Sequence, residues 1–177
     1  MTDNFSPILL NTLRLEGGET TDSGGHTNYG ITQSTYDSYA KANKLPAKNV
    51  SDLNMGDVRS VYENQYWKSP KIADISSSKV SGVLFDYGVN AGTPRAIKAL
   101  QREVGVKADG IIGKQTIAAV DKYIKDNGED FLAHQILNDR AKFYYELASQ
   151  NPHKYGRYID GWINRISKLK EMYSLNQ

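Results

Sequence analysis

The sequence contains no cysteine, which excludes disulfide bonds and thiolate metal sites. It also lacks a strong charge of either sign, because 22 Lys and Arg stand against 20 Asp and Glu, for a net charge of +2. A nucleic-acid-binding protein needs a concentrated basic face, so this balance argues against nucleic acid as a partner. Histidine is scarce as well: His26 is far in sequence from His134 and His153. We therefore expect no metal site, and interpret His26 as a polar loop residue.

Long hydrophobic runs are also missing. The opening "MTDNFSPILLNTLRLEGG" has Asp3 ahead of a short apolar segment and no basic region before it. Such a segment is neither a secretory signal peptide nor long enough to cross a bilayer. We expect the chain to be made and folded in the cytoplasm, so that a target outside the membrane would require another protein for access.

Helical periodicity dominates what is present. Phe5, Ile8, Leu9 and Leu13 fall on one face of a first helix that ends at the glycine pair 17–18. Strand signals are weak and allow at most a small hairpin between residues 19 and 31. The pattern predicts an α+β fold that is predominantly α-helical. Beyond the first, helices are expected near residues 32–43, 55–67, 76–92, 94–105, 114–124, 130–150 and 158–173.

Glu16 lies on the apolar face of the first helix, at its last turn. Burial against apolar groups and the negative C-terminal end of the helix both disfavour an ionised carboxyl group. A carboxylic acid that stays protonated can give its proton to a leaving oxygen as a general acid. The alternative is a helix-end glutamate that simply reaches solvent.

The residues after Glu16 favour the catalytic interpretation. Asp22 supplies a second carboxylate six residues later, and Gly24 and Gly25 permit a tight reversal and close approach of a ligand. Thr27 adds a short hydroxyl side chain. An acid, a second carboxylate and a hydroxyl in a turn-rich loop are the parts needed for glycoside hydrolysis.

The stretch "EGGETTDSGGHTNYGIT" resembles the E-G-G…D-P-G-G-x-T-N-x-G-I-T signature of glycoside hydrolase family 108. "YENQYW" and "FDYGVNAG" are similar to two further motifs of that family, in the same order. The family consists of N-acetylmuramidases found largely as phage endolysins, with a lysozyme-like fold. The resemblance implies Glu16 as catalytic acid, assisted by Asp22 and Thr27. It implies hydrolysis of the β-1,4 bond between N-acetylmuramic acid and N-acetylglucosamine, without metal or cofactor.

The resemblance also implies a biological setting. A phage endolysin is released to the periplasm and the cell wall after a holin-type protein permeabilises the membrane, and we expect this one to act as a monomer. The sequence departs from the family pattern in the loop between the two glycine pairs, which is shorter than usual. Glu19 stands where an aromatic residue is expected, and Ser23 replaces proline. Glu19 is therefore the alternative second carboxylate, ranked behind Asp22.

Several polar and aromatic residues of the matching motifs are candidates for contact with sugar rings and N-acetyl groups. For Trp67 and Tyr87 a place in the hydrophobic core is an equal alternative, and Asn90 has a turn residue as its alternative. The candidate substrate-binding residues are Asn28, Tyr66, Trp67, Tyr87 and Asn90.

The segment from Arg95 to Val120 resembles small peptidoglycan-binding modules. This suggests a lysozyme-like catalytic region at 1–93 and a helical peptidoglycan-binding-like region at 94–177, packed together as one unit. The Asp109-Gly110 pair is interpreted as a tight reversal between helices. The basic last helix is expected to pack on the protein, with contact to an anionic membrane or wall polymer as the alternative.

Two other functions stay open from the sequence. A lytic transglycosylase cuts the same bond with the sugar's own hydroxyl group, whereas Asp22 and Thr27 are water-holding groups that favour hydrolysis. A peptidoglycan-binding protein that has lost activity through the shortened loop is the second alternative.

Overall fold

The computed structural model describes residues 3–16, 20–22 and 25–175. Helices dominate, and a three-stranded antiparallel sheet with strand order β1-β2-β3 follows the first helix. The chain divides into two compact units, Met1–Ser69 and Pro70–Gln177. The predicted α+β class, predominantly α-helical, is therefore confirmed, and the expected hairpin has a third strand.

The first unit opens with helix α1 (Phe5–Leu15), which buries Phe5, Ile8 and Leu9 as the periodicity predicts. Strands β1 (Thr20–Asp22), β2 (Gly25–Asn28) and β3 (Ile31–Thr32) come next. Only Tyr29 and Gly30 connect β2 to β3, with φ angles of 53° and 76°. Positive φ at both central residues is the type I′ geometry whose twist matches that of a hairpin.

The rest of the first unit is helical. Helix α2 (Gln33–Ala42) begins at Thr32, whose hydroxyl accepts from the backbone N–H of Thr35 at 3.2 Å, as expected for an N-cap. The short 3₁₀ turn η1 (Val50–Asp52) and helix α3 (Met55–Tyr62) follow. The chain then continues as a six-residue π-helix, η2 (Glu63–Lys68). The periodicity predicted one uninterrupted helix here, and π-helical turns are frequent at functional sites.

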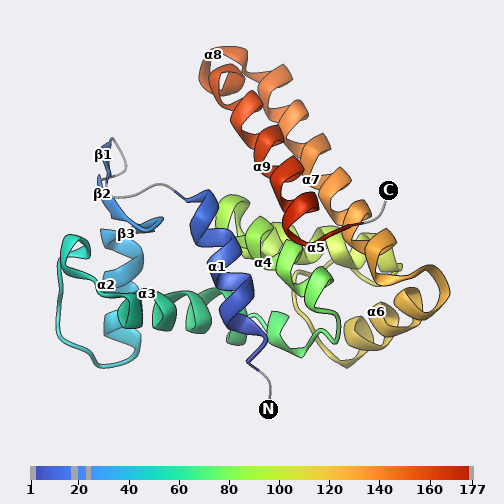
Figure 1. Cartoon of the computed structure of the whole chain (residues 1–177), viewed down its shortest axis with the longest axis horizontal. Helices are drawn as coiled ribbons and strands as arrows, with labels where there is room; N and C mark the ends of the chain where they lie inside the picture. Colours follow the sequence, from blue (N-terminus) through green and yellow to red (C-terminus); the bar gives the residue numbers. More distant parts are fainter. Residues whose placement is uncertain (1–2, 17–19, 23–24, 176–177) are drawn as a thin grey trace. The chain divides into compact units, whose positions relative to one another are not determined.

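In the second unit, α4 packs against α5 and α7, and α7 packs against α9. Figure 1 shows α7 and α9 running alongside each other, with α8 at one end of the pair. Every residue of α4 from Val80 to Gly88 is buried, so α4 is the central helix of this unit. The elements are η3 (Ile72–Asp74), α4 (Ser78–Ala91), α5 (Thr93–Val104), α6 (Lys114–Asn127), α7 (Glu129–Gln150), α8 (Pro152–Tyr155), η4 (Gly156–Tyr158) and α9 (Ile159–Met172).

A buried ion cluster joins α4, α7 and α9. Asp86 is fully buried and accepts from Arg140 Nη1 at 2.8 Å and from Arg165 Nε and Nη2 at 3.0 and 2.9 Å. Burial alone would raise the pKa of Asp86, but the two guanidinium groups outweigh it and hold the pKa below its ordinary value. Arg165, predicted on the basic face of the last helix, thus serves to dock that helix onto the protein.

Other expectations for the second unit are met with small shifts. Helix α5 begins one residue earlier than predicted, with Gly92 as its N-cap, and ends at Gly105 as expected. Asp109 accepts from the side chain of Gln101 and from the backbone of Ile111, which confirms the tight reversal.

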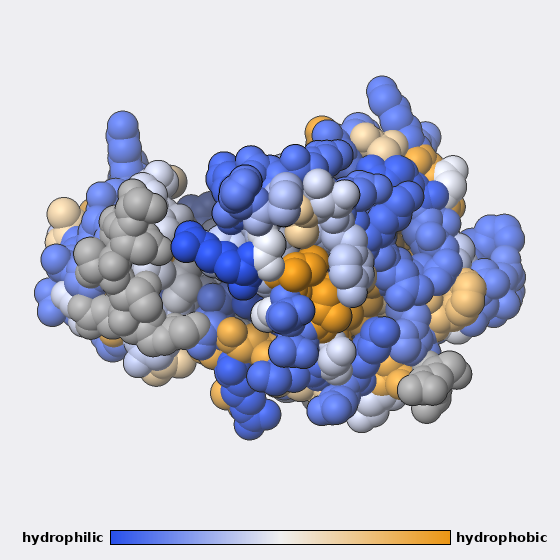
Figure 2. Space-filling model, turned by 90° about the horizontal axis from the view of Figure 1, so that it is seen from above, coloured by the Kyte–Doolittle hydropathy of each residue, from blue (hydrophilic) through white to orange (hydrophobic). Residues whose placement is uncertain are grey.

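One face of the molecule is shown in Figure 2 and is largely hydrophilic, with smaller hydrophobic areas between. Within the described residues, no helix combines the length and apolar character needed to span a bilayer.

Candidate active site

Glu16 is the residue at which α1 ends. Its backbone N–H still bonds to the carbonyl groups of Thr12 and Leu13, at 3.1 and 3.3 Å, while its own backbone has turned to the extended conformation. Glu16 therefore lies one residue beyond the helix instead of within its last turn. The residue is partly exposed, and its backbone is fixed by α1.

The turn between β2 and β3 passes directly against this carboxyl group. A Cβ atom added to Gly30 would lie 2.9 Å from Oε2 of Glu16 and 2.6 Å from the hydroxyl oxygen of Tyr62. Because real Cβ atoms do not approach so closely, and because φ is positive at Gly30, glycine is required here. The sheet and the end of α1 thus converge on one point.

Tyr62 fixes the same turn from the other side. Its side chain is 1% exposed, and its hydroxyl donates to the backbone carbonyl of Tyr29 at 2.6 Å. Glu16, Gly30 and Tyr62 therefore form one cluster with contributions from α1, the hairpin turn and α3. Tyr62 was not among the predicted site residues, although it opens the "YENQYW" motif.

Tyr66 joins this cluster from the π-helix η2. Burial raises the pKa of Tyr66; the nearby charge of Glu16 acts in the same direction, and a hydrogen bond with Thr35 opposes it. Tyr66, one of the predicted substrate-binding residues, therefore lies close to Glu16.

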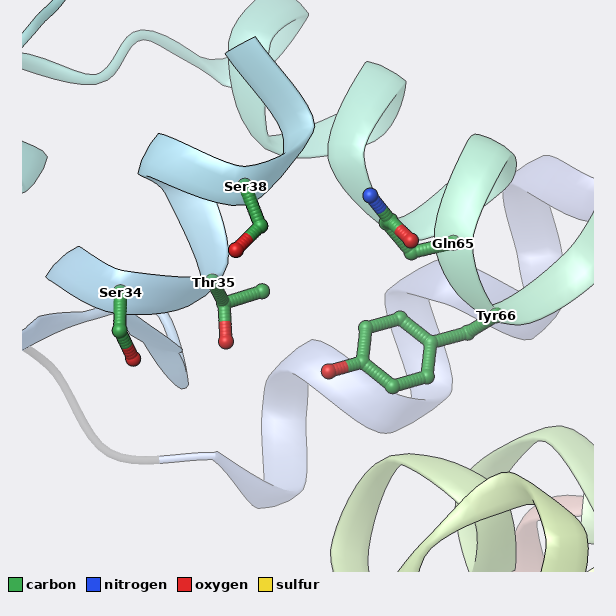
Figure 3. A pocket seen from close by; sticks show the side chains of 5 residues that line it. All are labelled: Ser34, Thr35, Ser38, Gln65 and Tyr66. Atoms are coloured by element: carbon green, nitrogen blue, oxygen red, sulfur yellow. The ribbon is translucent and has the colours of Figure 1, made fainter. Parts of the chain in front are cut away.

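A cavity of about 330 Å³ adjoins Tyr66. Figure 3 shows that its lining comes from α2 and η2, with the Tyr66 hydroxyl pointing toward Thr35. None of the side chains is charged, and all carry a hydroxyl or amide group. The lining residues are Ser34, Thr35, Ser38, Gln65 and Tyr66.

The proposed assistants of Glu16 lie in the sheet. Asp22 ends β1, where its backbone pairs with Gly25, and Thr27 lies in the central strand, paired with Thr20 and Thr32. Thr27 is partly exposed. Glu19 lies outside the described residues. Their catalytic roles stay predictions.

Asn28 and Trp67 make contacts within the first unit. Asn28 is 8% exposed and donates through Nδ2 to the carbonyl of Val50 at 3.0 Å, which ties β2 to η1. Trp67 is 7% exposed and packs on Phe5, with ring centroids 5.2 Å apart. The structure gives both residues internal roles, and their contact with substrate stays untested.

Tyr87 and Asn90 belong to the second unit. The Tyr87 side chain is buried and its hydroxyl donates to Asp139 at 3.3 Å. Oδ1 of Asn90 accepts from Arg140 Nη2 at 3.0 Å and from the hydroxyl of Tyr144. Both side chains thus take part in the hydrogen bonding of that unit, and contact with sugars again stays a prediction.

His26 lies in β2, where it pairs with Thr21, and not in a loop. Among the residues that the structure describes, no group of three or more His, Asp or Glu side chains gathers closely enough to hold a metal ion. The cluster around Glu16 contains a carboxyl group and the hydroxyl groups of Tyr62 and Tyr66.

Comparison with known protein families gives a match in each of two parts of the chain. Residues 9–92 match the family model of glycosyl hydrolase 108. The chain carries a glycosyl hydrolase 108 domain. Residues 95–167 match a second model, described as a predicted peptidoglycan domain. The glycosyl hydrolase 108 match contains Glu16, the sheet, α2, α3 and η2, so the whole cluster lies inside it.

The full chain also resembles a solved structure, that of SagA from Brucella abortus. The two share 26% sequence identity with a TM-score of 0.76, over 96% of this chain and 93% of that chain. No curated protein sequence matches the chain. The family resemblance expected from the motifs is confirmed, together with the lysozyme-like fold. The protein is a glycoside hydrolase that acts on peptidoglycan.

Proposed function

We propose that the protein is an N-acetylmuramidase, which hydrolyses the β-1,4 bond between N-acetylmuramic acid and N-acetylglucosamine. The observation that carries this proposal is the position of Glu16. Its partly exposed side chain lies at the end of α1, directly against the glycine turn between β2 and β3. A partly exposed carboxyl group on a fixed backbone is suited to protonate a glycosidic oxygen.

In the proposed mechanism, Glu16 donates its proton to the oxygen of the leaving sugar as the glycosidic bond breaks. Asp22 stabilises the positive charge that develops on the other sugar or orients the attacking water, and the Thr27 hydroxyl assists. The water oxygen forms the new bond to the anomeric carbon, and its proton passes to a carboxylate. Carboxyl and hydroxyl groups supply both roles, so the reaction needs neither metal nor cofactor.

The cavity beside Tyr66 supports a sugar as substrate. Its hydroxyl and amide groups match the hydroxyl and N-acetyl groups of an uncharged glycan, and a charged ligand would find no counterion among its lining side chains. We include Tyr66 among the residues that contact the substrate, because it borders this cavity and lies near Glu16.

The resemblance to phage endolysins supports a role in cell lysis. In this proposal the protein is made in the host cytoplasm as a monomer and reaches the wall after a holin-type protein permeabilises the membrane. The measurement is turbidity of cells that make the protein in their cytoplasm, with and without an agent that permeabilises the membrane. Lysis without the agent would contradict the need for a permeabilising partner.

Mass spectrometry of digested peptidoglycan tests the reaction. We expect wild-type protein to produce muropeptides with reducing N-acetylmuramic acid ends, and Glu16→Gln to produce none above background, because an amide cannot donate the proton. Anhydro ends would assign the protein to the lytic transglycosylases instead. A wild-type protein that binds peptidoglycan without new ends would be a binding protein.

A further inference from the structure

The second unit contains a cavity of different chemistry from the one beside Tyr66. Its volume is about 210 Å³, and α4, α5 and α7 contribute its walls. Where the first cavity has only neutral polar groups, this one is lined mainly by charged side chains. The lining residues are Tyr87, Arg95, Arg102, Asp139, Lys142, Phe143 and Glu146.

Positive charge is in excess in this cavity, with three cations against two carboxylates. The pairs that form are loose. Arg102 Nη2 lies 3.5 Å from Asp139 Oδ2, and Lys142 Nζ lies 4.0 Å from Glu146 Oε1. Exposed pairs of this kind contribute little stability, so exchanging one partner for a ligand group costs little.

Arg95 is the cation without a carboxylate partner among the residues that the structure describes. Its guanidinium carbon lies 3.9 Å from the centre of the Phe143 ring, while the residue itself is exposed. Stacking on the ring holds a guanidinium group in place and leaves its N–H edges available for bidentate bonding to a carboxylate. Such a pre-oriented group loses little side-chain entropy on binding an anion.

Asp139, which also lines the cavity, is held by two partners. It accepts from the hydroxyl of the buried Tyr87 at 3.3 Å, and Arg102 lies beside it. The cavity therefore presents an oriented carboxylate as well as oriented cations. A ligand that carries both an anionic and a cationic group satisfies these side chains better than a simple anion does.

The chemistry of peptidoglycan shows which part of it can supply such groups. The glycan strand is uncharged, because the lactyl carboxyl of N-acetylmuramic acid is consumed in the amide bond to the stem peptide. The stem peptide carries free carboxylates and the amino group of its diamino acid. We propose that this cavity binds the peptidoglycan stem peptide, with Arg95 and Arg102 on a peptide carboxylate and Asp139 or Glu146 on its amino group.

This inference rests on the proposed function insofar as peptidoglycan is the substrate, but it concerns binding and not bond cleavage. It assigns the two cavities complementary tasks, with the neutral one for sugars and the charged one for the peptide. The protein would then prefer peptide-bearing glycan over bare glycan.

The test is a titration of full-length Glu16→Gln protein with synthetic L-alanyl-γ-D-glutamyl-diaminopimelate, followed by NMR chemical shifts. We expect saturable binding that Arg95→Ala weakens about tenfold or more, since a charge-assisted bond to carboxylate is lost. Lys98→Ala is the matched control: it removes an exposed cation from the same helix, outside the cavity, and should bind like the parent. Amidation of the peptide's glutamyl and diaminopimelyl carboxyl groups should weaken binding as much as Arg95→Ala does.

Each outcome decides the proposal. Absence of saturable peptide binding, or equal loss in Arg95→Ala and Lys98→Ala, would overturn it. The proposed function is tested separately by digesting glycan strands from which an amidase has removed the peptides. If wild-type protein cleaves bare glycan but binds no peptide, the proposed muramidase activity stands and the peptide site is overturned. If it binds the peptide but cleaves no glycan, the peptide site stands and the muramidase activity is overturned.

Discussion

At Gly30 the hairpin turn and the carboxyl group of Glu16 share the space that a side chain would need. We expect Gly30→Ala to reduce peptidoglycan hydrolysis by about 100-fold, because displacing a catalytic group by about an ångström has that effect. The positive φ adds a cost of about 1–2 kcal/mol to folding. Turbidity assays and urea unfolding measure the two effects.

Gly161→Ala is the matched control for this substitution. Gly161 lies within α9, and a Cβ there would meet no atom within 4 Å. The activity of Gly161→Ala should equal that of wild type. Full activity in Gly30→Ala would show that the turn does not constrain Glu16.

Tyr62 allows a finer test, because only one oxygen atom is removed in Tyr62→Phe. The Tyr29 carbonyl then loses its hydroxyl partner, which costs about 1 kcal/mol and loosens the turn from the catalytic cluster. We expect kcat to fall about tenfold with little change in KM. Tyr123→Phe, which removes a hydroxyl bonded to Glu103 in the second unit, should leave kcat unchanged.

The residues of this cluster differ in how far the sequence predicts them. Helical periodicity leads to Glu16 as a candidate, although the structure places this residue one position beyond the helix, in the extended conformation. Tyr62 and Gly30 act through a contact between segments about 30 residues apart. No local pattern contains such a contact. The same limit applies to the hydrogen bonds of Asn90, whose partners Arg140 and Tyr144 lie 50 and 54 residues further along the chain.

Among the elements, α4 depends most on a single side chain. Asp86→Asn would leave two guanidinium groups, Arg140 and Arg165, facing a neutral amide inside the protein. We expect a loss of about 3–5 kcal/mol in the free energy of unfolding, as found when one partner of a buried ion pair is removed. Urea titration measures it. Asp126→Asn breaks an exposed pair with Lys122 and should change little, and equal effects of the two variants would contradict the role of the cluster.

The same carboxylate gives the second unit a dependence on pH. Because the pKa of Asp86 is lowered in the folded protein, its stabilisation is complete above its ordinary value of 3.8 and is lost as pH falls below that value. Urea unfolding between pH 7 and pH 2 should show wild-type stability falling in the acid range. Asp86→Asn should show a flatter profile, and parallel profiles would exclude Asp86 as a source of the dependence.

Element boundaries follow from the sequence where capping residues mark them, as Thr32 and Gly105 do. The π-helix η2 has no such mark. Its residues continue the helical periodicity of α3, and a widened turn depends on packing around Tyr66 and Trp67 that a single segment does not reveal.

At the scale of the whole molecule, the boundary between the parts of the chain that fold independently can be tested. The family matches meet between residues 92 and 95, close to the predicted boundary at 93, whereas the compact units divide at residue 69. We expect a fragment of residues 70–177 to unfold cooperatively in circular dichroism. A fragment of residues 94–177 lacks α4, and with it the Asp86 partner of two arginines, so it should show no cooperative transition. Cooperative unfolding of the shorter fragment would place the structural boundary after α4.

The ion cluster of α4 also sets an order in time. Asp86 and Arg165 are 79 residues apart in the chain. At a synthesis rate of about 5–20 residues per second, the ribosome makes Arg165 about 4–16 s after Asp86. During that interval α4 carries the charge of Asp86, but α9, which supplies Arg165, has not yet been made. Every residue of the first unit already exists by then. The cluster around Glu16 can therefore assemble on the ribosome, while the second unit closes only when synthesis is nearly finished.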